Sequence, residues 1–167
     1  GTRFFQEGLQ HPQRPYSWFR AAKRYRQAAA ALGGAPGWPE KEREEALALR
    51  RICRLNLAAC WLKLGAWVEA ERSCSLVLSE EPENAKALFR RGRALIELGD
   101  HAGAEQCARA VLKSDPKNRE AARLCATARE GLRAEAEERR GFMARMAQGL
   151  AGGAEAAAEA AAAASPP

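Results

Sequence analysis

The segments AACWLKLGAWVEAE, residues 58–71, and GRALIELGDHAGAE, residues 92–105, align with each other without a gap. The match continues at the same shift to the end of each unit, where a Val-Leu pair, a proline and an asparagine recur. The identical pairs are Leu64 and Leu98, Gly65 and Gly99, Ala70 and Ala104, Glu71 and Glu105, Val77 and Val111, Leu78 and Leu112, Pro82 and Pro116, and Asn84 and Asn118. Self-similarity at one fixed period predicts a fold of stacked repeats.

Each repeated position has a physical role in a pair of packed helices. Ala58 and Gly92 fall in the middle of predicted helices, where a small side chain allows a second helix to approach closely. Gly65 and Gly99 are suited to ending the first helix of each pair, and the repeated prolines to ending the second. The period and these roles resemble the tetratricopeptide repeat, a helix–turn–helix unit of about 34 residues that stacks into a superhelix.

Aligning the rest of the chain with this unit predicts an all-α superhelix of three repeats followed by a long capping helix. The predicted parts are a truncated first repeat with a loop insertion at 1–32, a linker at 33–39, a second repeat at 40–82, a third repeat at 83–116, a capping helix at 117–148 and an alanine-rich low-complexity tail at 149–167. We expect the tail to be disordered or a fraying helix, because it has no apolar stripe. The predicted inter-helix core comprises Leu64, Trp67, Ala70, Leu78, Leu98, Ala104, Val111 and Leu112.

Composition limits the function. The chain has 27 basic and 21 acidic residues and a net charge of +6, and the segment 1–38 carries six basic side chains against one acidic side chain. This balance favours either an acidic partner or a solvated basic face. No nucleic-acid-binding motif and no apolar run of membrane-spanning length occurs, so neither nucleic acid nor a membrane is expected as a partner. The start at Gly1, with no leader, predicts a piece of a longer protein.

The sequence predicts no catalytic, metal or cofactor site. Its five cysteines have no CxxC spacing, and its two histidines fall in predicted turns without a serine, cysteine or carboxylate at a recognisable distance. We therefore expect a non-enzymatic chain without a cofactor. Scattered thiols of odd number indicate a reducing compartment, and a cytoplasmic location is expected, with membrane anchoring or a nuclear location left open for a longer protein.

One set of polar residues coincides with the expected groove. Asn56 and Arg90 occupy the same position in successive repeats, and Lys86 lies one helical turn before Arg90 on the same face. First helices line the groove of such a superhelix. An amide, an ammonium and a guanidinium gathered there are suited to holding a carboxylate.

The stretches LNLAACWLKLG at 55–65, AKALFRRGRAL at 85–95 and DPKNREA at 115–121 resemble the tetratricopeptide domain of FK506-binding immunophilin co-chaperones. The resemblance covers about residues 1–148. It implies that the groove binds the acidic C-terminal peptide of Hsp90, with Hsp70 as a further partner, through a carboxylate clamp that includes Asn56, Lys86 and Arg90. The clamp's first asparagine position holds Thr2, and its first lysine position precedes Gly1. The family's prolyl-isomerase domain would also precede this chain.

Two other interpretations stay open. The chain could be a scaffold or self-association module, with the basic N-terminal section as its docking surface. The end of the capping helix could also bind a calmodulin-type partner, because it contains both basic and apolar residues. These residues are Arg139, Arg140, Phe142, Met143, Arg145, Met146 and Leu150.

Overall fold

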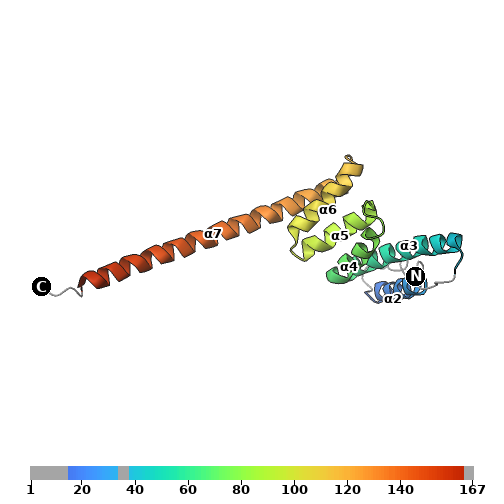
Figure 1. The fold of residues 1–167 in the computed structure, drawn as a ribbon, viewed down its shortest axis with the longest axis horizontal. Coiled ribbons are helices and arrows are strands. Elements are labelled where there is room, and N and C mark those ends of the chain that lie inside the picture. The colour runs from blue at the N-terminus through green and yellow to red at the C-terminus, as the bar shows by residue number, and fades with distance from the viewer. Residues whose placement is uncertain (1–14, 34–37, 164–167) are drawn as a thin grey trace. The chain divides into compact units, whose positions relative to one another are not determined.

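The computed structural model (Figure 1) describes the backbone of residues 15–33 and 38–163, and the side chains of residues 17–33 and 38–148. These residues form helices only. The helices are α2 (Pro15–Ala31), α3 (Glu40–Leu64), α4 (Trp67–Leu78), α5 (Ala85–Glu97), α6 (His101–Ser114) and α7 (Arg119–Ala163). The chain divides into two compact units, 1–129 and 130–167, and the groove-forming helices belong to the first. The predicted all-α repeat fold is confirmed.

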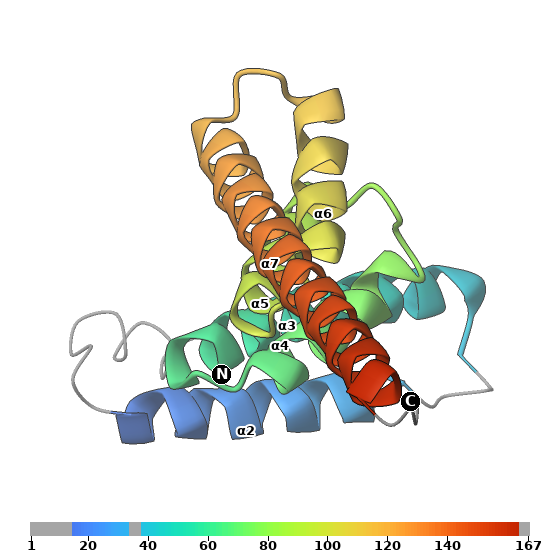
Figure 2. The ribbon, with the colours of Figure 1, turned by 90° about the vertical axis from the view of Figure 1, so that its left-hand side faces the viewer.

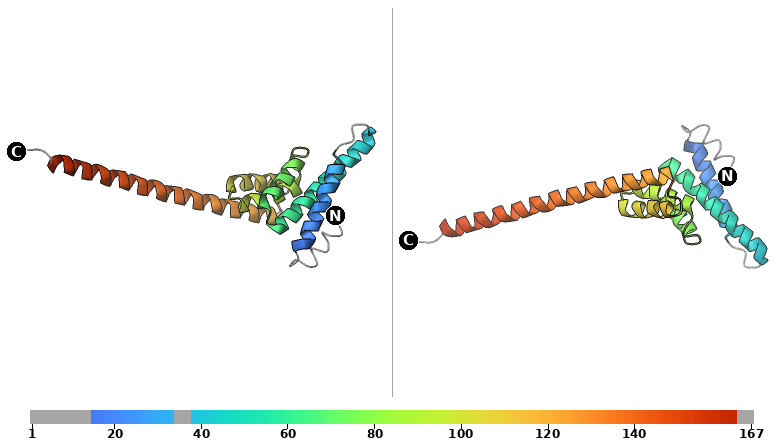
Figure 3. Two further views of the ribbon diagram at one scale, coloured as in Figure 1. Left: turned by 90° about the horizontal axis from the view of Figure 1, so that it is seen from below. Right: turned by 90° about the horizontal axis from the view of Figure 1, so that it is seen from above.

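The helices of the first unit pack on their neighbours in chain order. α3 and α4 form one helix–turn–helix pair, and α5 and α6 form the next. α2 lies alongside α3 (Figure 3), and its expected partner falls within residues 1–14, outside the described residues. The start of α7 follows the turn after α6 (Figure 2) and shares a buried cluster with α5 and α6.

The helix ends repeat because the residues that make them repeat. Gly65 and Gly99 have positive φ values of 71° and 79°, a conformation that glycine adopts without strain. Each turn is closed by the same backbone bond, from Ala66 N to Trp61 O at 3.0 Å and from Asp100 N to Leu95 O at 2.9 Å. These bonds satisfy the last carbonyls of the first helix in each pair.

The following helices begin on repeated asparagine caps. The Asn84 side chain accepts a hydrogen bond from Ala87 N at 3.0 Å, and the Asn118 side chain accepts one from Ala121 N at 3.0 Å. Each cap satisfies a backbone donor that the first helical turn leaves free. α5 and α7 therefore start in the same local geometry at the same position of successive repeats.

Small buried residues hold the helices close together. Gly92 lies where α5 meets α6 and α7, and a Cβ atom there would be 2.7 Å from Leu124 Cδ2 and 3.3 Å from Cys107 Cβ. Around α2, Trp18 and Tyr25 pack against Leu57 of α3. The core is continued by alanines and cysteines that are almost completely buried, so the spacing between helices is set by small side chains.

Most of the predicted core residues are at least half-buried, but the prediction for Leu98 is wrong. Ala70, Ala104 and Val111 are buried, and Leu64, Trp67, Leu78 and Leu112 are half-buried. Leu98 is 43% exposed, because it follows the last residue of α5 and no described cluster covers it. Its repeat counterpart Leu64 packs against the α2 cluster that contains Trp18.

α7 extends beyond the predicted capping helix at 117–148, since its backbone is helical to Ala163. Within residues 119–148, where its side chains are described, the buried ones are Ala121, Leu124, Cys125 and Ala128, all before the end of the first unit. In the second unit, the helix from residue 130 exposes Phe142, Met143 and Met146. The described part of the chain has no helix long and apolar enough to cross a membrane.

Candidate peptide-binding groove

A hollow of about 310 Å³ lies between the first helices of successive repeats and the start of α7. α3 contributes residues from its C-terminal end, and α5 contributes residues from one of its faces. The lining residues are Ala59, Leu62, Lys63, Lys86, Phe89, Arg90, Arg93 and Glu120. Four of these side chains are cationic and one is acidic, so the hollow favours a negatively charged ligand.

The positions of the basic side chains follow from helical periodicity. Lys86, Arg90 and Arg93 are separated by four and three residues, a spacing that places them on one face of α5. Lys86 and Arg93 are exposed, and neither forms a side-chain hydrogen bond or ion pair with the described residues. Their charges are therefore available to a ligand.

Arg90 is held differently. Its Nη1 atom donates a hydrogen bond of 2.8 Å to the Leu55 carbonyl oxygen of α3. Burial lowers the pKa of its guanidinium below the ordinary arginine value, although the nearby Cys74 and Cys60 oppose this shift. Arg90 thus links α5 to α3 while lining the hollow, and the link fixes one side of the guanidinium fork.

The structure brings together two of the four predicted site residues. Lys86 and Arg90 line the hollow, whereas Asn56 is half-buried on α3 and is not among the lining residues. Asn56 is one turn before Ala59, which does line it. Thr2 lies outside the described residues.

Sequence reasoning missed Lys63, Arg93 and Glu120. The signal for two of them was present, because Arg93 follows Arg90 by three residues and Lys63 follows Asn56 by seven, both on the same helical face. Glu120 is the counterpart of Lys86 one repeat later, but its charge has the opposite sign. Register alone could therefore place it in the groove without indicating what it does there.

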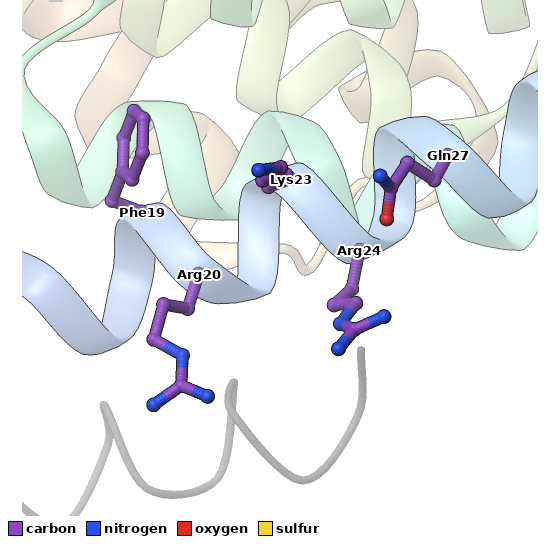
Figure 4. Close-up of a pocket in the computed structure, with 5 residues that line it drawn as sticks. All are labelled: Phe19, Arg20, Lys23, Arg24 and Gln27. Carbon is purple, nitrogen blue, oxygen red and sulfur yellow. The ribbon is translucent and has the colours of Figure 1, made fainter.

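A second hollow, of about 290 Å³, lies on α2 and is lined by Phe19, Arg20, Lys23, Arg24 and Gln27. Arg20 and Arg24 extend to the same side of the helix, one turn apart (Figure 4). Phe19 is 52% exposed. This surface corresponds to the basic N-terminal section of the scaffold interpretation, but a single described helix supplies its lining, whereas three helices converge on the groove.

The buried thiols of Cys60 and Cys74 have low reactivity. Burial raises the pKa of the Cys60 and Cys74 thiols to about 12, so both remain protonated and weakly nucleophilic near neutral pH. All five cysteines are free, and the described residues contain no cluster of three or more histidine, cysteine, aspartate or glutamate side chains able to hold a metal ion.

Comparison with known proteins identifies the repeat. A tetratricopeptide-repeat family model matches residues 62–128, from the end of α3 to the buried start of α7. Human peptidyl-prolyl cis-trans isomerase FKBP4 is 31% identical over 151 residues, which are 90% of this chain and 31% of that protein. Residues 62–128 thus carry tetratricopeptide repeats, and most of the chain is similar to FK506-binding immunophilins. It spans 22% to 31% of the length of the curated relatives it matches.

Solved structures agree on the fold of this tetratricopeptide-repeat chain. The C-terminal tetratricopeptide-containing domain of a Plasmodium falciparum FK506-binding protein superposes with a TM-score of 0.68 at 21% identity, covering 81% of this chain and 90% of that one. The Saccharomyces cerevisiae Hsp90 co-chaperone Cns1 superposes with a TM-score of 0.52 at 22% identity, covering 89% of this chain and 44% of that one. At these identities both structures show that the fold is shared.

Proposed function

We propose that the groove binds the acidic C-terminal peptide of Hsp90 and makes this chain the interaction module of a cytoplasmic co-chaperone. Lys86 and Arg90 would hold a carboxylate between them, with Asn56 as a neutral donor and Thr2 at the clamp position that precedes the described residues. The observation that carries the proposal is the convergence of Lys63, Lys86, Arg90 and Arg93 on one hollow.

The chemistry of these groups supports a carboxylate ligand. Lys86 supplies a compact positive charge that no described residue neutralises. Arg90 presents a planar guanidinium whose orientation is restrained by its bond to Leu55, so less conformational freedom is lost on binding. The chain would act by binding, and the isomerase activity named for relatives such as FKBP4 would belong to other parts of those longer proteins.

A peptide series tests recognition of the terminal carboxylate. We expect a short Hsp90 C-terminal peptide with a free carboxylate to bind about tenfold or more tightly than its amidated or scrambled versions, a difference of about 1.4 kcal/mol. Fluorescence polarisation measures all three, and the Hsp70 C-terminal peptide gives the comparison between chaperones. Equal affinities for the free-acid, amidated and scrambled peptides would contradict the clamp and favour the scaffold interpretation.

Lys86→Ala tests the groove directly. It should weaken binding of the free-acid peptide by about 1.5–3 kcal/mol, the range for a lost hydrogen bond to a charged group. Lys41→Ala is the matched control, because Lys41 is an exposed lysine of α3 outside the hollow and its loss changes the net charge equally. An equal loss of affinity in both variants would mean that general charge, and not the groove, binds the peptide.

A calmodulin-type partner for the second unit is a further candidate, because its exposed apolar side chains lie among arginines. Phe142, Met143 and Met146 are 54%, 63% and 51% exposed. A basic helix with such anchors is typical of ligands that calmodulin takes into its apolar grooves. Calcium-dependent retention on immobilised calmodulin, lost in the Phe142→Ala and Met146→Ala double variant, is the expected result. Retention that is unchanged in the double variant would contradict this site.

A further inference from the structure

One repeat position carries three kinds of side chain in three successive groove helices. Ile52 of α3, Lys86 of α5 and Glu120 of α7 are counterparts, each one repeat period after the one before. All three are exposed, Ile52 by 53%. Equivalent residues of stacked repeats follow one another along the groove. A ligand running along the stack would therefore meet an apolar, then a cationic and then an anionic side chain.

Glu120 lies within the cationic hollow and yet is not neutralised there. It lines the same hollow as Lys63, Lys86 and Arg93, but forms no side-chain hydrogen bond or ion pair with any described residue. It belongs to the first turn of α7, where a carboxylate also stabilises the helix dipole. A role confined to the helix would change the stability of the fold without changing which ligand is bound.

We propose that Glu120 is a specificity-determining residue of the groove, which rejects a carboxylate at the α7 side and selects a ligand with a basic residue there. This inference rests on the proposed function, because it assumes an acidic peptide held at Lys86 and Arg90. Like charges placed together in an interface disfavour the wrong partner, whereas an opposite charge is favoured. The groove would then distinguish peptides by the position at which their acidic run ends, as well as by their total charge.

A charge-inversion experiment tests the proposal. The probes are acetylated peptides with an acidic C-terminal run and a free carboxylate, in which one upstream residue at a time is Lys, Gln or Glu. With the wild-type chain, we expect the Lys peptide to bind about threefold to tenfold more tightly than the Glu peptide at one upstream position. With Glu120→Lys this order should reverse at that position, and with Glu120→Gln the preference should largely disappear.

Glu69→Lys is the matched control, because Glu69 is an exposed glutamate of α4 outside the hollow and its replacement changes net charge by the same amount. A reversal in Glu120→Lys alone supports the proposal. The same ranking of peptides in wild type, Glu120→Lys and Glu69→Lys overturns it, even if Glu120→Lys alters the melting temperature. Should Lys86→Ala bind every peptide as tightly as wild type, the proposed function itself fails.

Discussion

Gly92 is a residue where three helices of the repeats pack closely together. An added Cβ would meet Leu124 Cδ2 of α7 at 2.7 Å and Cys107 Cβ of α6 at 3.3 Å. The Leu124 contact could be relieved by rotating a flexible side chain. The Cys107 contact belongs to the first side-chain atom of a helix, and moving it means moving α6.

Replacing Gly92 by leucine should therefore destabilise the fold by about 1–3 kcal/mol or more, because the extra atoms have no space between three helices. Urea denaturation followed by circular dichroism measures the change. Gly141→Ala is the control: an added Cβ there would meet only the end of the flexible Arg145 side chain, at 3.4 Å, and alanine favours helix. An unchanged midpoint in Gly92→Leu would show that α5 does not cross its neighbours at this residue.

For Arg90, the sequence predicts the position of the side chain but not its contacts. Register placed it in the groove with Lys86, and the structure has both there. The bond from Arg90 to the Leu55 carbonyl could not be predicted, because it depends on the separation of α3 and α5 and on the side-chain rotamer. Lys86→Ala is consequently the cleaner binding variant, since Arg90→Ala also removes a link between helices.

At the scale of elements, an ion pair joins the second helix of each of two repeats to the helix that follows it. Glu71 of α4 accepts from Arg91 of α5 at 2.8 Å, and Glu105 of α6 accepts from Arg129 of α7 at 2.7 Å. The two glutamates are repeat counterparts, whereas the arginines are not, because Arg129 lies one turn beyond the counterpart of Arg91. An ion pair between successive helices is thus present in both repeats, although its arginine comes from a different repeat position.

The Glu71 pair predicts a pH-dependent contribution to stability. Burial raises the pKa of Glu71, but hydrogen bonds from Arg91 and Ser75 outweigh this and hold it below the ordinary value of 4.5. A carboxyl with a lowered pKa in the folded state stabilises the fold above its unfolded pKa, and this stabilisation is lost as pH falls through the folded pKa.

Glu71→Gln should therefore reduce the free energy of unfolding most at neutral pH, and the difference from wild type should shrink as pH falls below 4.5. Urea titrations at pH about 7 and about 3.5 provide the comparison, the second lying below the ordinary glutamate range. Glu69→Gln, an exposed residue of the same helix, serves as control. If the difference in the free energy of unfolding between Glu71→Gln and wild type is the same at both pH values, titration of Glu71 does not contribute to the pH dependence of stability.

Helix positions were well predicted where local residues end each helix. α3 ends at Leu64 and α5 ends at Glu97, beside Gly65 and Gly99, the two glycines predicted to end them. The end of α7 was not predicted. Alanine favours helix at every position of the tail, but nothing local determines whether an unpacked helix continues or frays.

At the scale of the whole molecule, the first unit carries its own core. Among the side chains of α7 described by the structure, residues 119–148, the last buried one is Ala128, and the compact unit ends at Arg129. A chain that stops after Arg129 keeps Ala121, Leu124 and Cys125, which cover α5 and α6. Residues 130–167 contribute a separate unit.

Truncation after Arg129 should leave the melting temperature of the first unit within about 2 °C of the full chain, a shift that corresponds to well under 1 kcal/mol. Truncation after Lys117 should lower it strongly, because it removes the side chains that cover Val111 and Cys107. Differential scanning calorimetry distinguishes the two. A large drop in the melting temperature of the chain that ends at Arg129 would mean that the helix beyond Arg129 is needed to stabilise the repeats.

The matched asparagine caps at Asn84 and Asn118 also bear on how such a chain can evolve. Residues 84–117 begin on one cap and are followed by another of the same hydrogen-bond geometry. A tandem duplication of this cassette would thus join two ends that already fit, and neither junction would require a new turn. Every inserted copy would bring its own lysine and arginine to the groove, so the reach of the ligand site could grow by gene duplication before any point mutation refined it.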